Sequence, residues 1–488
     1  GFATEIASGS VFAFTEWDPD GGGPLLAGPL AVGSIVTAGT RTVSNIASWQ
    51  GSDWRQLGNG LGTGATTGAV FALTTWDGDG GGPGNAQVVA GGTFTVASGK
   101  VVNHIARFDG SEWHPLGTGM TGGGGGGTVY GLSTWDPDGG GPLSDEIVAV
   151  GDFVTAGGVT VNEVAHWNGT QWQAFGTGIG AHLNAVTVWD TDGPGGAPGI
   201  VVVGGTFTEA TGKPGNYVAM WNGSAWQRMD NGFIDTVYAL AAFSPTGNPA
   251  DTRVYAGGQF GAAPPFQYIA QWNGTAWSQL VNGVNSNVQA LTEWRSSSSR
   301  LVVGGAFSTA STTIANRVAA WTGSAWVSTA FEPGLSGLPG VVYSLTSWDP
   351  DGPGPLRPQV IAGGTITKTT SVNPPAVNNI ARWDGNSWEP LGLGTSANGT
   401  VFALTTWDPD GPGPQSAMLV AGGAFNMAGG LPGSLISAVS GCAAVCNSCD
   451  TNCDGVVNSG DVQPFIDMVL ELAARAHRAR ATPMAAGR

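Results

Sequence analysis

Short apolar runs separated by turn residues recur along most of the chain. Each run has five to eight residues, is rich in Val, Ile, Phe and Trp, and is bounded by Gly, Pro, Asn-Gly or Asp-Gly. This pattern predicts short β-strands joined by tight turns. No long stretch with the 3.6-residue period of an amphipathic helix interrupts the runs before residue 460. The pattern therefore predicts an all-β fold for most of the chain.

The runs belong to three phrases that repeat together. The first, Val-x-Ala-Leu-x-x-Trp-Asp, recurs with its large aromatic residue at Trp17, Trp76, Trp135, Trp189, Phe243, Trp294, Trp348 and Trp407. The second, apolar-apolar-Gly-Gly-x-Phe-Thr, occurs eight times at spacings of 47 to 59 residues, with its last glycine at Gly33, Gly92, Gly151, Gly205, Gly258, Gly305, Gly364 and Gly423. The third, Asn-x-Ile/Val-Ala-x-Trp-Asp/Asn-Gly-Ser/Thr-x-Trp, follows the first seven copies and holds aromatic pairs five residues apart at Trp49/Trp54, Phe108/Trp113, Trp167/Trp172, Trp221/Trp226, Trp272/Trp277, Trp321/Trp326 and Trp383/Trp388.

Each unit therefore contains four predicted strands. A four-stranded sheet of about 50 residues cannot bury both of its faces alone, and radial stacking of such sheets in a β-propeller buries them. Eight units over residues 1–430 predict eight blades, and a seven-bladed ring with extra strands is the alternative. The eighth unit contains a third predicted strand at residues 435–439 but lacks the aromatic-pair hairpin, so we expect the amino-terminal strand to complete the last blade and close the ring.

The repeated phrases resemble known families. An apolar triplet ending in Gly-Gly, followed by an aromatic residue and then a Trp, resembles the kelch repeat, as in residues 88–92 with Phe108 and Trp113. The Asp/Asn-Gly-x-x-Trp hairpin is similar to the sialidase Asp-box, and the whole pattern resembles repeat proteins on the surfaces of planctomycete-like bacteria. These resemblances imply a propeller fold, and a fold alone implies no activity.

Pairs of aspartates follow the first strand in six of the eight units. They stand in the phrase Trp-Asp-Pro-Asp-Gly or a variant of it, at Asp18/Asp20, Asp77/Asp79, Asp136/Asp138, Asp190/Asp192, Asp349/Asp351 and Asp408/Asp410. Asp before Gly caps tight turns through its own backbone. Carboxylates two residues apart are also oxygen ligands for Ca²⁺, although each loop alone supplies fewer than the six to eight that Ca²⁺ takes. The sequence leaves turns or weak calcium sites as alternatives.

The aromatic pairs have two interpretations as well. Exposed indole faces stack on sugars, whereas an aromatic residue at the same place in every unit packs between blades. We favour packing.

A catalytic constellation is not evident. The four histidines before residue 400, His104, His114, His166 and His182, are scattered, and no cysteine precedes residue 442. Residues 122–127 are a run of glycines without the Lys of a phosphate loop, which indicates a flexible connection.

Composition changes after residue 441, where a calcium loop is predicted. Residues 450–461 match the EF-hand loop, and the predicted oxygen ligands are Asp450, Asn452, Asp454, the carbonyl of Val456, Asn458 and Asp461. An apolar helix face follows at residues 462–473. Asp at the last loop position, with no helix entering the loop, resembles half of a dockerin, which implies an attachment module. We assign residues 431–441 to a linker and 442–488 to this module.

The chain has four cysteines, all in this module. They are Cys442, Cys446, Cys449 and Cys453. A zinc site is one interpretation, but two of the cysteines flank or enter the calcium loop, so two disulfides in an oxidising compartment are favoured. Three connectivities are allowed and the sequence does not choose among them.

The charge balance excludes one class of partner. The 488 residues include 17 Lys and Arg against 34 Asp and Glu, a formal charge of −17, whereas nucleic acid binding needs a basic surface. No apolar run of about 18 residues predicts a membrane span, and no signal peptide is evident at the start of this chain.

The sequence therefore predicts an exported, non-enzymatic β-propeller that binds a protein or polysaccharide at the cell surface or outside a bacterial cell, with calcium as its cofactor. Two alternatives stay open. One is a polysaccharide hydrolase or lyase with carboxylates as acid and base, and the other is a structural subunit of an extracellular assembly. Charged side chains converging on one end of the central channel favour the enzyme, and dissimilar polar residues there favour the scaffold.

Overall fold

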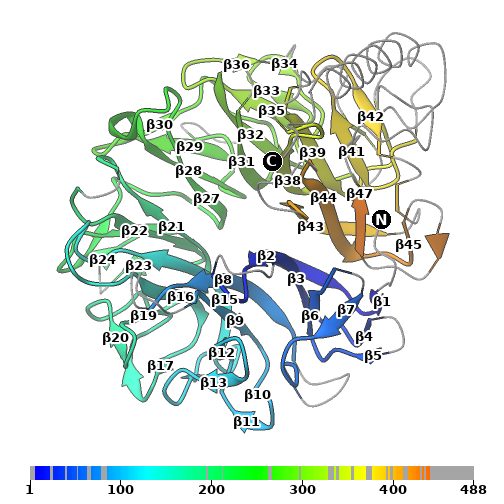
Figure 1. The fold of residues 1–488 in the computed structure, drawn as a ribbon. Coiled ribbons are helices and arrows are strands. Elements are labelled where there is room, and N and C mark those ends of the chain that lie inside the picture. Colours follow the sequence, from blue (N-terminus) through cyan, green and yellow to red (C-terminus); the bar gives the residue numbers. More distant parts are fainter. Residues whose placement is uncertain are drawn as a thin grey trace, which may run out of the picture.

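The computed structural model describes residues 6–21, 26–38, 41–51, 53–62, 68–78, 85–193, 196–210, 213–261, 266–295, 298–327, 335–336, 340–352, 357–369, 376–391, 394–395, 399–409, 416–428, 431–432 and 436–439. In these residues seven four-stranded antiparallel sheets and one three-stranded sheet stand in a ring (Figure 1). The prediction of an all-β propeller built from four-stranded units is thereby confirmed.

The sheets are numbered 1 to 8 in chain order, and each runs outward from the ring axis. Sheets 1 to 4 contain β2 (Val11–Trp17), β3 (Gly28–Gly33), β6 (Ile46–Trp49) and β7 (Trp54–Gln56); β8 (Val70–Trp76), β9 (Gln87–Gly92), β12 (Ile105–Phe108) and β13 (Trp113–Pro115); β15 (Thr128–Trp135), β16 (Glu146–Asp152), β19 (Val164–Trp167) and β20 (Trp172–Ala174); and β21 (Leu183–Trp189), β22 (Ile200–Gly205), β25 (Val218–Trp221) and β26 (Trp226–Arg228). Sheets 5 to 8 contain β27 (Val237–Phe243), β28 (Arg253–Gly258), β29 (Ile269–Trp272) and β30 (Trp277–Gln279); β31 (Val288–Arg295), β32 (Ser299–Gly305), β35 (Val318–Trp321) and β36 (Trp326–Val327); β38 (Val342–Trp348), β39 (Gln359–Gly364), β41 (Ile380–Trp383) and β42 (Trp388–Pro390); and β43 (Thr400–Trp407), β44 (Met418–Ala424) and β47 (Ile436–Val439).

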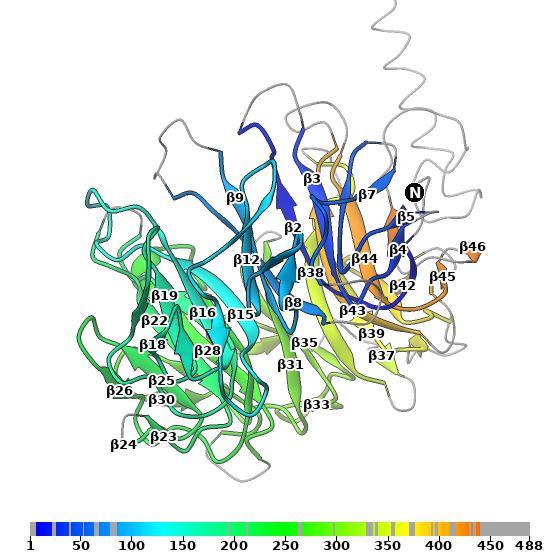
Figure 2. The same cartoon turned by 90° about the horizontal axis from the view of Figure 1, so that it is seen from below.

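The first strand of every sheet lies innermost, next to the axis. Each inner strand contacts the inner strands of the sheets on both sides, including β43 against β2. The side view in Figure 2 shows β2, β8, β31 and β38 crossing the thickness of the ring. Because neighbouring strands are antiparallel, the turns between first and second strands share one face of the ring with the turns between third and fourth strands. The start of each inner strand lies at the opposite face.

The ring closes by packing of sheet 8 on sheet 1. Trp407 Nε1 donates a hydrogen bond of 2.8 Å to the carbonyl oxygen of Ala27, and Gly422 lies against Val11 and Phe14. The expectation that the amino-terminal strand completes the last blade is wrong for the described residues. That strand, β1 (Ile6–Ser8), pairs instead with β4 (Thr37–Ala38) beside sheet 1.

The third strand predicted for the last unit at residues 435–439 is observed as β47, which pairs with β44 within residues 431–441. The remaining short strands form two- or three-stranded ribbons beside the large sheets: β5 (Arg41–Thr42), β10 (Val96–Ala97), β11 (Lys100–Val101), β14 (Met120–Thr121), β17 (Thr155–Ala156), β18 (Val159–Thr160), β23 (Glu209–Ala210), β24 (Lys213–Pro214), β33 (Thr309–Ala310), β34 (Thr313–Ile314), β37 (Leu335–Ser336), β40 (Lys368–Thr369), β45 (Met427–Ala428) and β46 (Leu431–Pro432). A short 3₁₀ helix, η2 (Pro249–Asp251), lies between β27 and β28.

The Gly-Gly phrase is explained by two close approaches. A Cβ on Gly92 would lie 2.0 Å from the carbonyl oxygen of Ala69, at the start of the inner strand of the same sheet. A Cβ on Gly91 would lie 2.5 Å from a methyl group of Val129, in the inner strand of the next sheet. The second glycine is therefore required within its own sheet, and the first is required by the packing of neighbouring sheets.

Tryptophans of the inner strands join each sheet to the next. Seven of them donate Nε1–H to a carbonyl oxygen just before or at the start of the second strand in the following sheet, at 2.6 to 2.9 Å: Trp17, Trp76, Trp135, Trp189, Trp294, Trp348 and Trp407. A buried hydrogen bond of this kind contributes on the order of 1 kcal/mol. In sheet 5 the equivalent residue is Phe243, whose side chain has no N–H group to donate.

Tryptophans of the outermost strands reach in the other direction. Five of them donate Nε1–H at 2.7 to 3.0 Å to a carbonyl oxygen that follows the fourth strand of the preceding sheet: Trp113, Trp172, Trp226, Trp277 and Trp326. The repeated tryptophans therefore hold the ring together from both sides of each sheet.

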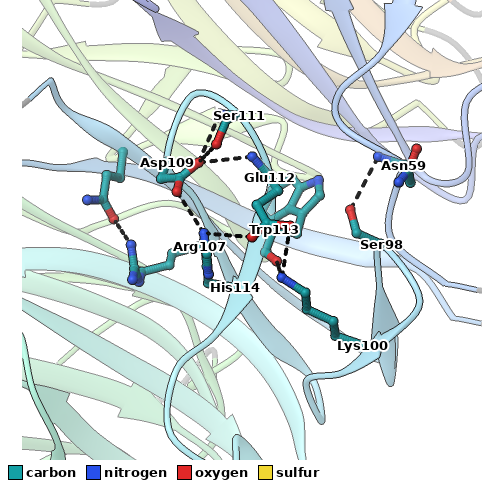
Figure 3. A network of polar contacts seen from close by, with 10 residues as sticks. Asn59, Ser98, Lys100, Arg107, Asp109, Ser111, Glu112, Trp113 and His114 are labelled. Carbon is teal, nitrogen blue, oxygen red and sulfur yellow. Dashed lines mark hydrogen bonds and ion pairs between the residues drawn. The ribbon is translucent and has the colours of Figure 1, made fainter.

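The turns between third and fourth strands are capped by their first residue. In sheet 2, Asp109 Oδ1 accepts from the backbone N–H groups of Ser111 and Glu112, both at 2.9 Å, and its Oδ2 lies 2.7 Å from His114 Nε2 (Figure 3). Burial of Asp109 acts to raise its pKa, but these hydrogen bonds outweigh burial and hold the pKa well below its usual range. Asn168, Asn222, Asn273 and Asp384 cap the equivalent turns.

Tyr255, in the second strand of sheet 5, makes stability sensitive to alkaline pH. Its side chain is fully buried, and burial raises the pKa of Tyr255 to about 12. The unfolded chain loses this proton near pH 10, so the free energy of unfolding should fall between about pH 10 and pH 12. Tyr255→Phe should remove this part of the decline. Denaturant unfolding across that pH range measures the decline in the free energy of unfolding. Tyr343→Phe, at an exposed position, is the control. Identical pH profiles for Tyr255→Phe and wild type would contradict the prediction.

Candidate functional site at one end of the ring axis

A β-bulge occurs at the same place in all eight inner strands. The pairing of first and second strands skips the second residue of the repeated phrase in every sheet, as between Val70 and Ala72 in sheet 2. Bulges re-aim side chains next to functional sites. The eight bulge residues are Phe12, Phe71, Tyr130, Asn184, Tyr238, Gln289, Tyr343 and Phe402.

Five of these bulge residues form a continuous series of ring contacts around the axis. Phe12 lies between Phe71 and Phe402, with ring centroids 5.6 and 5.8 Å away. Phe71 stacks on Tyr130 at 5.5 Å, and Tyr343 lies 6.0 Å from Phe402. These five residues are called the aromatic arc. The arc spans sheets 7, 8, 1, 2 and 3, and it joins residues from both ends of the ring-forming chain.

The rest of the circle is polar. At the end of the arc, His182 lies 4.6 Å from the Tyr130 ring, and its Nε2 donates to Asn184 Oδ1 at 2.8 Å. In sheet 5 the hydroxyl of Tyr238 donates to Gln259 Oε1 at 2.5 Å, and burial together with nearby Asp235 raises the pKa of Tyr238. Sheet 6 contributes Gln289. Sheets 4, 5 and 6 therefore present amide, imidazole and phenol groups opposite the arc.

The arc is accessible to solvent and carries no charge. Four of its residues are half-buried, and Tyr343 is 38% exposed although it is a large aromatic side chain. None of the eight bulge residues is charged. Partly exposed aromatic side chains gathered in one place, beside a few fixed polar groups, are typical of a binding site for a small or narrow ligand.

The opposite end of the inner strands holds hydroxyl groups and two carboxylates. Burial, Asp408 and Asp18 raise the pKa of Glu16 in β2. In β31, burial acts to raise the pKa of Glu293, but hydrogen bonds from Arg295 and Ser299 outweigh it and lower that pKa. The charged groups on the inner strands thus lie at the end of the axis away from the arc.

Three of the predicted aspartate loops contain a turn capped by their first aspartate. Asp136 accepts from the backbone N–H groups of Asp138, Gly139 and Gly140 at 2.8 to 3.0 Å. In sheets 1 and 4, Asp18 and Asp190 likewise accept from the backbone N–H groups of the residues two and three positions later. In sheet 7, burial and a hydrogen bond with Asp351 raise the pKa of Asp349.

Within the described residues, no group of three or more His, Cys, Asp or Glu side chains lies close enough together to hold a metal ion. Calcium binding by the aspartate loops stays a prediction. The loop carboxylates of Asp20, Asp77, Asp192 and Asp408 belong to the described part of the chain, whereas Asp79 and Asp410 lie outside it. The carboxyl group of Asp192 accepts from the backbone of Ala197, which adds to the turn role.

The repeated aromatic pairs are buried, as the packing interpretation predicts, except that Trp326 is only partly buried. In sheet 3 the rings of Trp167 and Trp172 lie 5.5 Å apart and are 6% and 2% exposed. They are therefore unavailable as platforms for a sugar. The repeat pattern pointed to these pairs as aromatic positions, with packing favoured over ligand stacking, and it did not predict the aromatic arc. The available signal was the variable second position of Val-x-Ala-Leu-x-x-Trp-Asp, which is aromatic in six of eight copies.

The scattered histidines have separate local roles. His166 pairs with Glu146 beneath Trp135, and His114 joins the Asp109 turn, while His182 alone lies at the arc. Residues 122–127, predicted as a flexible connection, instead form a turn. There Asp152 Oδ1 accepts from Gly124 N at 2.9 Å.

The carboxy-terminal module lies outside the described residues. This applies to the calcium loop at residues 450–461 and to all four cysteines. In the part of the chain that the structure covers, no helix is long and apolar enough to cross a membrane.

Comparison with known proteins finds similar solved structures but no family for this chain. No known protein family matches the chain, and no curated protein is similar to it in sequence. Among solved structures it is similar to Sqt1 of Saccharomyces cerevisiae, with 14% identity, a TM-score of 0.41 and coverage of 89% of this chain and 97% of that one. It is also similar to a GH74 enzyme of Niastella koreensis (14% identity, TM-score 0.43, coverage 88% and 61%) and to the WD40 β-propeller domain of Doa1 (12%, 0.29, 66% and 95%).

The ring of radial antiparallel sheets by itself defines the chain as a β-propeller protein. No match supports the kelch or dockerin resemblance, and both stay predictions.

Proposed function

We propose that this protein is an exported, non-enzymatic β-propeller of eight blades that binds an extracellular ligand through the aromatic arc. The observation that carries the proposal is the uninterrupted series of ring contacts from Tyr343 to Tyr130, on residues that are partly exposed. An arc built from five equivalent bulges is rigid, because each bulge is held by its own sheet. Rigid aromatic surfaces bind ligands at a low entropic cost.

The carboxy-terminal module has a separate role in this proposal. Residues 450–461 bind one calcium ion, and the module attaches the propeller to a cell surface or an extracellular assembly. The acidic composition and the four clustered cysteines support an exported protein with two disulfides.

Calcium titration of the full chain tests the module. After chelator treatment, calorimetry should show about one site of high affinity, and Asp450→Ala with Asp454→Ala should remove it. Asp136→Ala in a propeller loop is the matched control and should leave the titration unchanged, because Asp136 caps a turn. Five or more sites would instead assign calcium to the aspartate loops, and an absence of binding would remove the attachment module from the proposal.

The hydrolase alternative has one favourable observation. The raised pKa of Glu16, next to Asp18 and Asp408, is typical of a general acid. Because this carboxyl group lies at the other end of the axis, catalysis there is separable from binding at the arc. The test is an assay for reducing ends released from polysaccharides. If wild type and Phe71→Leu release them and Glu16→Gln does not, the protein is a hydrolase and the non-enzymatic proposal is wrong.

Loss of ligand binding on alteration of the arc tests the main proposal. On arrays of extracellular polysaccharides and proteins, wild type should bind at least one component that the double variant Phe12→Ser/Phe71→Ser does not bind. Thr75→Ala, at the other end of β8, is the control and should bind as wild type does. If every component bound by wild type is bound equally by the arc variant, the proposal is wrong.

A further inference from the structure

We infer that the ligand of the aromatic arc is an uncharged saccharide with an exposed apolar ring face. This inference rests on the proposed function and names the ligand class of the same site. It follows from the division of one circle of bulge residues into an aromatic part and a polar part.

The aromatic part suits the faces of sugar rings. Phe402, Phe12, Phe71 and Tyr130 follow one another at centroid separations of 5.5 to 5.8 Å, so several ring faces and edges line a single curved surface. A pyranose has a face of C–H groups that packs against such rings, while its hydroxyl groups stay around its edge. A series of neighbouring rings can therefore hold neighbouring sugar units.

The polar part suits the hydroxyl groups. Asn184 and Gln289 offer both N–H donors and carbonyl acceptors, and neutral amides are matched to groups that donate and accept. Asn184 is held in place because its Nδ2 donates to the carbonyl oxygen of Val237 at 3.2 Å and its Oδ1 accepts from His182. Fixed amides beside a stacking surface supply orientation, whereas the aromatic rings supply most of the apolar contact.

Charge distinguishes this ligand from other ligands that stack on aromatic rings. The bulge residues include no Lys or Arg, and the chain carries a formal charge of −17, so a phosphate-bearing or sulfated chain would be repelled. None of the eight positions is Asp or Glu, so a cationic ligand would meet ring faces at these positions without a carboxylate to pair with its charge. A proline-rich peptide is the remaining uncharged candidate, but such peptides dock in extended grooves rather than on a closed circle. We therefore favour the saccharide.

Calorimetric titration of the full chain with neutral oligosaccharides tests the inference. The probes are hexasaccharides of β-1,4-glucose, N-acetylglucosamine, xylose and mannose, together with a sulfated hexasaccharide and a proline-rich decapeptide. One neutral hexasaccharide should bind. Phe71→Leu, which keeps apolar bulk but removes the flat ring, should weaken that binding about tenfold, and Gln289→Ala should weaken it several-fold. Thr75→Ala should bind with wild-type affinity.

Each other outcome overturns the inference in a distinguishable way. Binding of the peptide or the sulfated sugar, lost in Phe71→Leu, would overturn the saccharide and leave arc binding intact. Neutral saccharide binding that is equal in all variants would overturn the saccharide at the arc and the proposed function together. Binding retained in Phe71→Leu but lost in Gln289→Ala would show that stacking is not the basis of recognition. If no neutral hexasaccharide binds while the arrays still reveal a ligand of the arc, the inference is wrong and the proposed function stands.

Discussion

Replacement of Trp113 by alanine is expected to lower the free energy of unfolding by about 3 to 5 kcal/mol. The indole is fully buried between sheets 1 and 2, packs at 5.3 Å from the ring of Phe108, and donates to the carbonyl oxygen of Leu57 at 3.0 Å. Truncation leaves a large cavity and removes one of the two hydrogen bonds that the Leu57 carbonyl oxygen accepts, the other coming from Gly60 N–H at 3.1 Å. Denaturant unfolding followed by intrinsic fluorescence measures the change.

Two further variants separate the contributions at this junction. Trp113→Phe keeps most of the volume and loses the hydrogen bond, so it should cost about half as much as alanine. Glu112→Ala changes the neighbouring exposed side chain, 52% accessible in its ion pair with Lys100, and should change stability by less than about 0.5 kcal/mol. An equal loss in Glu112→Ala and Trp113→Ala would show that the turn, rather than the buried indole, stabilises the junction.

Replacement of Gly92 by alanine is expected to cost about 3 kcal/mol, or to prevent folding. The added Cβ would lie 2.0 Å from the carbonyl oxygen of Ala69 and 2.8 Å from the Cα of Val70. Both are backbone atoms, so the clash is relieved only if the backbone at the Phe71 bulge shifts. A folded variant should therefore also show altered ligand binding at the arc.

The matched control for this prediction is Gly124→Ala. Gly124 lies in the turn capped by Asp152, and the nearest atom to an added Cβ there is a carboxylate oxygen of that side chain at 3.4 Å, an ordinary contact. The variant should be as stable as wild type when both are compared by thermal and denaturant unfolding. A Gly92→Ala variant as stable as Gly124→Ala would mean that the bulge has room to relax.

Local features of the fold were readable from the sequence because they depend on neighbouring residues. Asn or Asp before Gly, followed by Ser or Thr, predicts a capped turn, and Asn168 and Asp109 cap such turns. The Gly-Gly phrase marked the second strand of every unit. Repetition then implied sheets that bury one another, and the burial of the Trp167/Trp172 pair followed from that implication.

Contacts between distant segments were decided only by the tertiary structure. The sequence placed the amino-terminal strand in the last blade, whereas β1 pairs with β4 and the ring closes through Trp407 and Ala27. Both pairings satisfy the same local pattern, so only the packing of sheet 8 on sheet 1 distinguishes them. By contrast, the third strand of the last unit, predicted at residues 435–439, is observed as β47.

The sequence by itself determined the strands, the turns, the repeat and the all-β propeller, because each of these follows from residues close together in the chain. The tertiary structure alone decided where the unburied aromatics gather. Strand alternation has a period of two, and a bulge breaks that period at the second residue of the repeated phrase in each inner strand, so the direction of Phe12 is not given by its position. Closing the ring then brings Phe12 against Phe402, and this contact completes the aromatic arc.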